Sequence, residues 1–509
     1  MKKMIHDIRI MAALLMAGAA FTACSTDGDD IINDQPQEQT PKTYTITVQA
    51  TKDLDATRGL ELSDNELNSV WEVGEKVMVV QPNASDEPTC IGELTAQTAG
   101  KYTTLTGTVD GTFDPSKMLT FYLHDTTFDF SGQDGTLATL GKSFTYGYCQ
   151  KSTSEISVSG STVTITGGLT FANAQAVVRF NLVDKATGDP INITSLTVHD
   201  ARGKLIQKAD QLDPSSSGLV RDDVTISLNS ASNIVFASLS GVSSSDLTLI
   251  ATDGTDTWTY SKTGVTFTPS GYYQVKTEMT KSVMTVGNFL NNDGSFTEMK
   301  LTGTVAVIAH MGAIANYCDK YLAIALEDAK NATPATCSWS ECFYWVNNFA
   351  SKHPVTIAGT TYNVSATGTA DGYDKVEEDA DRLKSTATAT ELRKGWRLPT
   401  VTDWKYILAG FAALNGLTLT DGTNTVSPTN PAGIYGTTSY YAGDSGAILR
   451  NAINTACGNT ALKNTYWLGS EVKASVSSYA FSYKFYDSKG YFNPDGKGMS
   501  NYARAVFAY

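Results

Sequence analysis

Alternation of apolar and polar residues is the feature that most constrains how this chain can fold. Tyr44, Ile46 and Val48 share one side of an extended segment, and the polar residues between them share the other. A side-chain period of two indicates a β-strand with one buried face. Thr, Ser, Gly and Tyr are abundant, whereas runs of Lys and Glu are scarce, which also favours extended structure. We therefore expect a mainly β protein.

Further strand-like segments form two sets, and turns bearing Gly and Asp separate the strands. The first set continues through 70–80, 118–124 and 156–166. The second set covers 169–171, 176–182, 195–199, 224–228, 233–237, 247–251 and 272–279. Short strands at this spacing predict all-β sandwiches, and neither set contains a long amphipathic helical pattern.

The amino terminus has the pattern of an export signal, which we place at residues 1–23. A short basic start precedes the apolar run 10–20, which is too short to remain as a membrane-spanning helix. Small residues then precede Cys24, and this spacing resembles the lipobox of bacterial lipoproteins, in which the cysteine receives diacylglycerol. An ordinary secretory signal with an incidental cysteine is the alternative. If Cys24 is lipidated, it tethers the chain to the outer membrane.

Residues 24–42 are polar and should form a flexible tether. The acidic run 25–30 resembles the signal that sends lipoproteins of the Bacteroidota to the cell surface, although a solvated linker explains it equally well. The net charge of -14 argues against a nucleic-acid partner, because phosphate binding needs a basic face.

Six cysteines follow Cys24, and an even number in an exported protein permits disulfides whose pairing the sequence leaves open. They are Cys90, Cys149, Cys318, Cys337, Cys342 and Cys457. Cys337 and Cys342 have the spacing of half a zinc site, but no second pair of ligands lies at a useful distance. We predict no metal site and no cofactor.

Three motifs occur in an order that resembles the fimbrillins, the pilin subunits of Bacteroidota. They are Arg58-Gly59-Leu60 followed by Trp71-x-x-Gly74-Glu75-Lys76-Val77, then the stretch 169–180, and finally Pro269-Ser270-Gly271-Tyr272-Tyr273. The resemblance implies two tandem transthyretin-like β-sandwich pilin domains, at 43–167 and 168–281.

The resemblance also implies proteolytic processing between Arg58 and Gly59, which would remove the first strand with Tyr44, Ile46 and Val48. Removing a strand exposes unpaired backbone groups and an apolar groove. A strand donated by another pilin subunit could fill that groove by β-augmentation. An exposed loop arginine with no such role is the alternative reading of Arg58.

Residues 282–509 have an α+β pattern. We expect strands at 304–309, 321–326, 465–469, 478–485 and 503–509, and helices at 340–350, from Thr400 onward and over 444–458. Trp396-Arg397-Leu398-Pro399-Thr400, with 323–329, 466–471 and 502–506, resembles a C-type-lectin-like domain. Trp396, Leu398 and Trp404 are expected to be core residues of that domain.

The ligand of this domain is not apparent, because the calcium-lectin signatures are missing. The acidic residues Asp371, Asp374, Glu377, Glu378, Asp379 and Asp381 could bind calcium, but no calcium-loop motif supports this and a solvated face explains them better. A tract rich in aromatic residues is a weak candidate for the face that binds a glycan or protein ligand, with loop packing as the alternative: Tyr483, Tyr486, Asp487, Tyr491, Phe492, Asn493 and Asp495.

No catalytic motif is present, and we expect a protein that is not an enzyme. The formylglycine-generating enzymes share the lectin-like fold, but the cysteine pair they need late in the domain is missing. The sequence thus predicts a cell-surface adhesin, most simply a tip subunit that accepts a donor strand in a fimbrium. A pilus anchor that retains its lipid, or a stand-alone binding lipoprotein, is the alternative.

Overall fold

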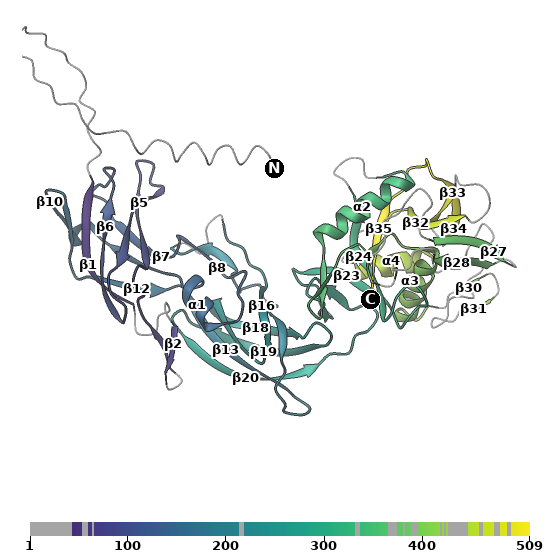
Figure 1. Ribbon diagram of the computed structural model, residues 1–509, viewed down its shortest axis with the longest axis horizontal. Helices are drawn as coiled ribbons and strands as arrows, with labels where there is room; N and C mark the ends of the chain where they lie inside the picture. The colour runs from purple at the N-terminus through teal and green to yellow at the C-terminus, as the bar shows by residue number, and fades with distance from the viewer. Residues whose placement is uncertain are drawn as a thin grey trace, which may run out of the picture. The chain divides into compact units, whose positions relative to one another are not determined.

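The computed structural model describes residues 43–52, 60–63, 66–212, 218–330, 336–364, 374–379, 382–387, 392, 394–417, 420–421, 424–425, 446–457, 462–472, 479–485 and 490–509. This part of the chain is mainly β, as expected (Figure 1). Within it, no helix is both long enough and apolar enough to cross a membrane. The signal peptide and tether expected at 1–23 and 24–42 lie outside the described residues.

The first sheet contains nine described strands and closes on itself where one edge strand pairs with an interior strand. Their order is β10-β11-β1-β12-β9-β7-β4-β5-β6, and β1 also pairs with β6. The strands are β1 (Tyr44–Lys52), β4 (Lys76–Pro82), β5 (Pro88–Ala96), β6 (Tyr102–Val109), β7 (Leu119–Leu123), β9 (Gly147–Lys151), β10 (Ile156–Ser159), β11 (Thr162–Ile165) and β12 (Leu169–Asn173). Seven of these, from β1 through β12 to β6, therefore form a closed barrel.

The second sheet has seven described strands in the order β16-β14-β18-β19-β20-β13-β17. They are β13 (Gln175–Asp184), β14 (Ile193–Asp200), β16 (Val224–Ser232), β17 (Ile234–Ser240), β18 (Val242–Thr252), β19 (Thr257–Phe267) and β20 (Tyr272–Lys281). Alternate residues of β13 and β14, including Val178, Phe180 and Leu196, point into one core. This pattern is what the period-two alternation predicts.

The two sheets exchange segments, so the sequence ranges 43–167 and 168–281 do not divide them cleanly. Strand β12 follows residue 168 but pairs with β1 and β9 of the first barrel. Conversely, β8 (Thr127–Asp129) pairs with β15 (Lys208–Asp210), and Phe128, Phe130 and Tyr146 pack in the second core. Helix α1 (Leu137–Ser143) lies in this exchanged segment, and a hairpin of β2 (Leu60–Ser63) and β3 (Glu66–Ser69) follows β1.

Two further described sheets and three helices make up the α+β region. One sheet has the order β22-β21-β23-β24-β35-β29, and the other has the order β28-β27-β32-β33-β34. The first contains β21 (Phe289–Asn291), β22 (Phe296–Thr297), β23 (Thr304–Met311), β24 (Tyr321–Ala329), β29 (Gly395–Arg397) and β35 (Ala503–Ala508). The second contains β27 (Asp374–Asp379), β28 (Arg382–Ala387), β32 (Thr465–Val472), β33 (Tyr479–Phe485) and β34 (Gly490–Gly496). Short hairpins pair β25 (Val355–Ile357) with β26 (Thr360–Tyr362) and β30 (Thr420–Asp421) with β31 (Asn424–Thr425).

The helices are α2 (Trp339–Lys352), α3 (Val401–Leu414) and α4 (Gly446–Ala456). Capping boxes start the first two, with Ser338 and Glu341 on α2 and Thr400 and Asp403 on α3. Trp396, Leu398 and Trp404 are completely or almost completely buried, which confirms that they are core residues. All three helices occur where the sequence predicts them.

Candidate functional site

Strand β1 is the candidate site because it closes the first barrel. On one side it pairs antiparallel with β6 at eight consecutive positions, from Tyr44 opposite Val109 to Thr51 opposite Tyr102. On the other side it runs parallel to β11 and then to β12, where Ala50 lies opposite Leu169. Figure 1 shows β1, in purple, beside β6. Removing β1 would leave hydrogen-bonding edges on both sides of one groove.

Alternate side chains of β1 fill the barrel interior. Ile46, Val48 and Ala50 have at most 4 % of their surface exposed and belong to the barrel core, while the residues between them face outward. Tyr44 packs at the entrance, with its ring 5.2 Å from that of Phe113 in an edge-on arrangement. Burying an aliphatic side chain of this size contributes about 1.5–3 kcal/mol, so the strand is held by its interior face as well as by its backbone.

The last inward residue of β1 is a lysine. Lys52 continues the alternation of the three apolar residues, yet its side chain is completely buried. Its Nζ donates hydrogen bonds to the Val70 carbonyl at 2.8 Å and to Glu75 Oε2 at 2.9 Å. The same ammonium lies 4.3 Å from the centroid of the Trp71 ring. A buried ion pair with a cation–π contact therefore closes one end of the strand site.

The first strand expected from the alternation is present as β1, and its removal stays a prediction. Lys52, Trp71 and Glu75 were not predicted as parts of its site. Tyr44, Ile46 and Val48 all lie on β1 with the inward phase expected. The signal for Lys52 was available, since it stands in phase with them at the end of the same alternation. Cys24, Arg58 and Gly59 lie outside the described residues, so their predicted roles stay predictions.

The expected aromatic ligand face is wrong for the two rings that the structure describes. Tyr483 and Phe492 are at most 2 % exposed. They lie opposite one another on β33 and β34, and the Tyr483 ring stacks on Trp404 of α3 at 5.2 Å. Helix α3 therefore covers the face of the hairpin that was expected to bind a ligand. Tyr486 and Asp487 lie outside the described residues, and only the backbone of Tyr491 is described.

The two polar members of that tract that the structure describes, Asn493 and Asp495, are hydrogen-bonded within the β33–β34 hairpin. Asp495 is 5 % exposed, accepts a hydrogen bond from Ser482 Oγ at 2.6 Å and pairs with the Lys484 ammonium at 3.0 Å. The Asn493 amide also donates to the Asp495 carboxylate. These contacts brace the β33–β34 hairpin.

The acidic cluster considered for calcium is described only at Asp374 with its side chain. Asp374 is completely buried and accepts hydrogen bonds from the Tyr317 hydroxyl at 2.9 Å and from the Ser470 hydroxyl. Asp371 and Asp381 lie outside the described residues, and the side chains of Glu377, Glu378 and Asp379 are not described. Among the described residues, no group of three or more His, Cys, Asp or Glu residues is arranged to hold a metal ion.

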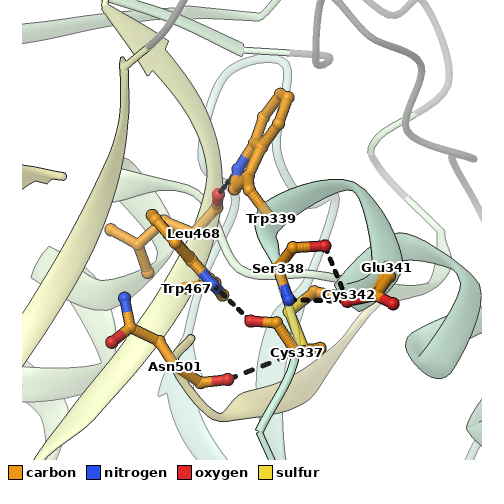
Figure 2. Close-up of a disulfide and its surroundings, with 8 residues drawn as sticks. All are labelled: Cys337, Ser338, Trp339, Glu341, Cys342, Trp467, Leu468 and Asn501. Carbon is orange, nitrogen blue, oxygen red and sulfur yellow. Dashed lines mark hydrogen bonds between the residues drawn. A yellow bond between two sulfur atoms is a disulfide. The ribbon is translucent and has the colours of Figure 1, made fainter. Parts of the chain in front are cut away.

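Cys337 and Cys342 form a disulfide, so neither thiol is free to ligate zinc (Figure 2). The bridge spans the start of α2, where Glu341 receives hydrogen bonds from the Ser338 amide and hydroxyl. The Trp467 indole donates to the Cys337 carbonyl at 2.9 Å, and the Trp339 indole donates to the Leu468 carbonyl at 2.7 Å. The disulfide thus fixes the start of α2, and the two indole hydrogen bonds hold it against β32.

The other thiols in the α+β region are expected to be unreactive. Neither Cys318 nor Cys457 forms a disulfide, and both are buried. Burial raises the pKa of the Cys318 thiol to about 12 and also raises the pKa of Cys457. Because the thiolate is the reactive form, both groups are poor nucleophiles near neutral pH.

No family model matches the chain, and no curated protein does either. The solved structures that resemble it include a fimbrial assembly protein from Parabacteroides distasonis, with 11% identity, a TM-score of 0.27, and coverage of 46% of this chain and 90% of that chain. A protein assigned to cell adhesion from Bacteroides uniformis has 14% identity and a TM-score of 0.29, covering 49% and 99% of the two chains. The shaft pilin SpaA from Lactobacillus rhamnosus GG has 11% identity and a TM-score of 0.23, covering 48% and 99%.

Proposed function

We propose that this chain is a cell-surface adhesin subunit of a fimbrium that accepts a donor strand in place of β1. The observation that carries the proposal is the position of β1, which is paired on both edges and fills the barrel core with alternate residues. A groove of this kind suits β-augmentation, in which backbone hydrogen bonds give affinity and side-chain pockets give specificity. Release of β1 would follow cleavage between Arg58 and Gly59.

A position at the fimbrial tip fits the α+β region. Its last strand, β35, pairs with β24 on one edge and with β29 on the other, so it is an interior strand of its own sheet. Such a strand is committed to its domain and does not itself complement a neighbouring subunit. In this proposal, the chain accepts a strand from another pilin subunit, and the C-type-lectin-like region binds a glycan or protein ligand.

Mass spectrometry of the mature amino terminus tests the proposal directly. The chain would be isolated from intact cells and from sheared surface fibres, and its first residue determined in each fraction. We expect Gly59 as the first residue of the chain in fibres. A lipidated Cys24 on every molecule, together with no chain in the fibres, would contradict the tip assignment.

A lipid-retaining anchor or stand-alone surface lipoprotein is the second candidate. One observation favours it, namely that β1 already fills its groove in the uncleaved chain and leaves the first barrel complete. The formylglycine-generating reaction is disfavoured, because Cys318 and Cys457 are buried and their thiol pKa values are raised. The same mass measurement separates the two structural candidates, since only the anchor keeps its lipid.

A further inference from the structure

The end of the groove beside Lys52 carries a polar receptor that does not belong to β1. It consists of the Val70 carbonyl, the ring face of Trp71 and the carboxylate of Glu75, which together surround the Lys52 ammonium. We refer to these three groups as the Glu75 receptor. Each of them attracts a cation, through a carbonyl dipole, an aromatic quadrupole and a negative charge respectively.

Neighbouring segments other than β1 hold this receptor in shape. The Trp71 amide donates to the Gly100 carbonyl at 2.7 Å, and the Gly100 amide donates back to the Trp71 carbonyl at 3.0 Å. Glu75 Oε2 also accepts from the Glu72 amide at 3.1 Å, and the Glu75 carbonyl accepts from the Ala96 amide at 2.8 Å. These bonds join the turn before β4 to β5 and to the turn that follows β5. None of them involves β1, so they can persist when β1 leaves.

We propose that the Glu75 receptor selects the chemistry of the strand that fills the groove. The partner strand it fits has apolar residues at alternate positions and a lysine at the end beside Trp71 and Glu75. This inference rests on the proposed strand replacement and adds to it the kind of strand that is accepted.

The energetic argument is one of desolvation. The Glu75 side chain is 3 % exposed. A donor strand with an apolar residue in the place of Lys52 would leave this buried carboxylate without its ammonium partner. Breaking one side of a buried ion pair costs far more than breaking a pair in solvent. The period of the strand excludes a slip of one residue, because that slip turns every inward side chain outward. A slip of two residues keeps the inward face but moves the lysine away from Glu75. The receptor therefore fixes the register against the slip of two.

The test uses the full-length chain with a specific protease site inserted between residues 58 and 59, so that the β1 segment stays in place after the cut. Two amidated peptides are then offered in excess. One has the β1 sequence YTITVQATK, and the other ends in methionine instead of lysine. Intact mass spectrometry under native conditions measures how much of each peptide replaces the cleaved segment.

We expect the lysine peptide to enter and the methionine peptide to bind about 100-fold more weakly or worse. An E75Q chain should lose most of this preference. An E75K chain should instead prefer a peptide that ends in glutamate, and this reversal distinguishes charge recognition from simple loss of packing. Thermal melting of each cleaved variant checks that the barrel remains folded, and K76M, which removes a partner of the exposed Glu93, is the matched control.

Equal entry of the lysine and methionine peptides would overturn the selection and leave strand replacement standing. If neither peptide enters any of the cleaved chains, strand replacement fails, and both the proposed function and this inference fall with it. If the E75K chain prefers lysine as strongly as the natural chain does, the cation is recognised elsewhere and the receptor is wrongly assigned.

Discussion

Lys52 and Glu75 form an ion pair whose side chains are at most 3 % exposed, at the end of a strand that is otherwise apolar inside. Replacing Lys52 by methionine keeps much of the side-chain volume but removes the ammonium from Glu75 Oε2. We expect the full-length K52M chain to lose about 3 kcal/mol of unfolding free energy in the first barrel. Urea titration combined with hydrogen exchange of the β1 segment measures this loss.

The exposed pair of Lys76 and Glu93 provides the control for that substitution. Its side chains are 61% and 54% exposed, and K76M should change the unfolding free energy by no more than about 0.5 kcal/mol. Similar losses for K52M and K76M would mean that the buried pair contributes nothing special, and the argument for a cation receptor would lose its energetic basis.

A pH-sensitive contact lies in the second sheet, where His199 Nδ1 is 2.7 Å from Asp223 Oδ1. The hydrogen bond to Asp223 raises the pKa of His199 above its ordinary 6.5, and partial burial opposes this. A raised folded-state pKa means that the stabilisation is complete below the unfolded pKa. It is lost as the pH rises through the folded pKa.

Because the pair is only partly buried, we expect its contribution to the unfolding free energy to be at most about 1 kcal/mol. The natural chain should lose this contribution as the pH rises from about 5 to about 8.5. The H199Q variant should lose that part of the pH dependence. Thermal melting of both proteins at the two pH values is the measurement. A pH dependence that is unchanged in H199Q would assign the effect to other groups.

At the scale of elements, helix α3 approaches strand β23 through a glycine. A Cβ built on Gly410 would lie 1.8 Å from the Ala309 carbonyl oxygen, which is far inside van der Waals contact. The helix tolerates the poor propensity of glycine because the close approach buries Trp404, Ile407 and Phe411. G410A should push the helix off the sheet and cost about 3 kcal/mol or more, despite its better helix propensity.

Circular dichroism melting of G410A against A413S tests this expectation. Ala413 lies on the exposed side of the same helix, so its substitution by serine should be nearly silent. A G410A protein that melts at or above the natural temperature would show that the helix can shift without loss. The packing argument for this glycine would then be wrong.

Elements with strong local signals could be predicted from the sequence, and elements that depend on distant contacts could not. The helices α2 and α3 begin at capping residues, Ser338 and Thr400, that are readable without a structure. Helix α1 has only seven residues, and a helix of that length depends on its surroundings for stability. Strand β12 alternates like any strand, and nothing local shows that it pairs with β1 and β9 instead of joining the second sheet.

The candidate sites divide in the same way. The period of β1 correctly indicates which side chains face inward, and it extends to Lys52. The prediction of an exposed aromatic face is wrong at Tyr483 and Phe492 because a hairpin rich in rings can bury either face. In the structure, Tyr483 stacks on Trp404, Phe492 packs against Tyr483, and both rings are buried. Ligand faces on such hairpins depend on which helix covers them, and this information is not local.

At the scale of the whole molecule, the proposed function requires that β1 can leave. Thr47 of β1 lies directly opposite Thr106 of β6, and Thr47 faces outward. Cysteines at these two positions would place a cross-strand disulfide on the outside of the barrel without disturbing the core. The oxidised T47C/T106C chain would keep β1 in its groove even after the chain is cut.

We expect the oxidised T47C/T106C chain to reach the cell surface normally and to be missing from sheared fibres, because the groove cannot receive a donor strand. The single variant T47C should assemble like the natural chain, which controls for the loss of the threonine. Mild reduction of the double variant should restore incorporation, since it frees β1 without changing the sequence. Quantitative mass spectrometry of the surface and fibre fractions measures all three.

If the oxidised double variant enters fibres as efficiently as the single variant, release of β1 is not part of assembly. The closed barrel, with β1 still in its groove, would then be the form that enters fibres.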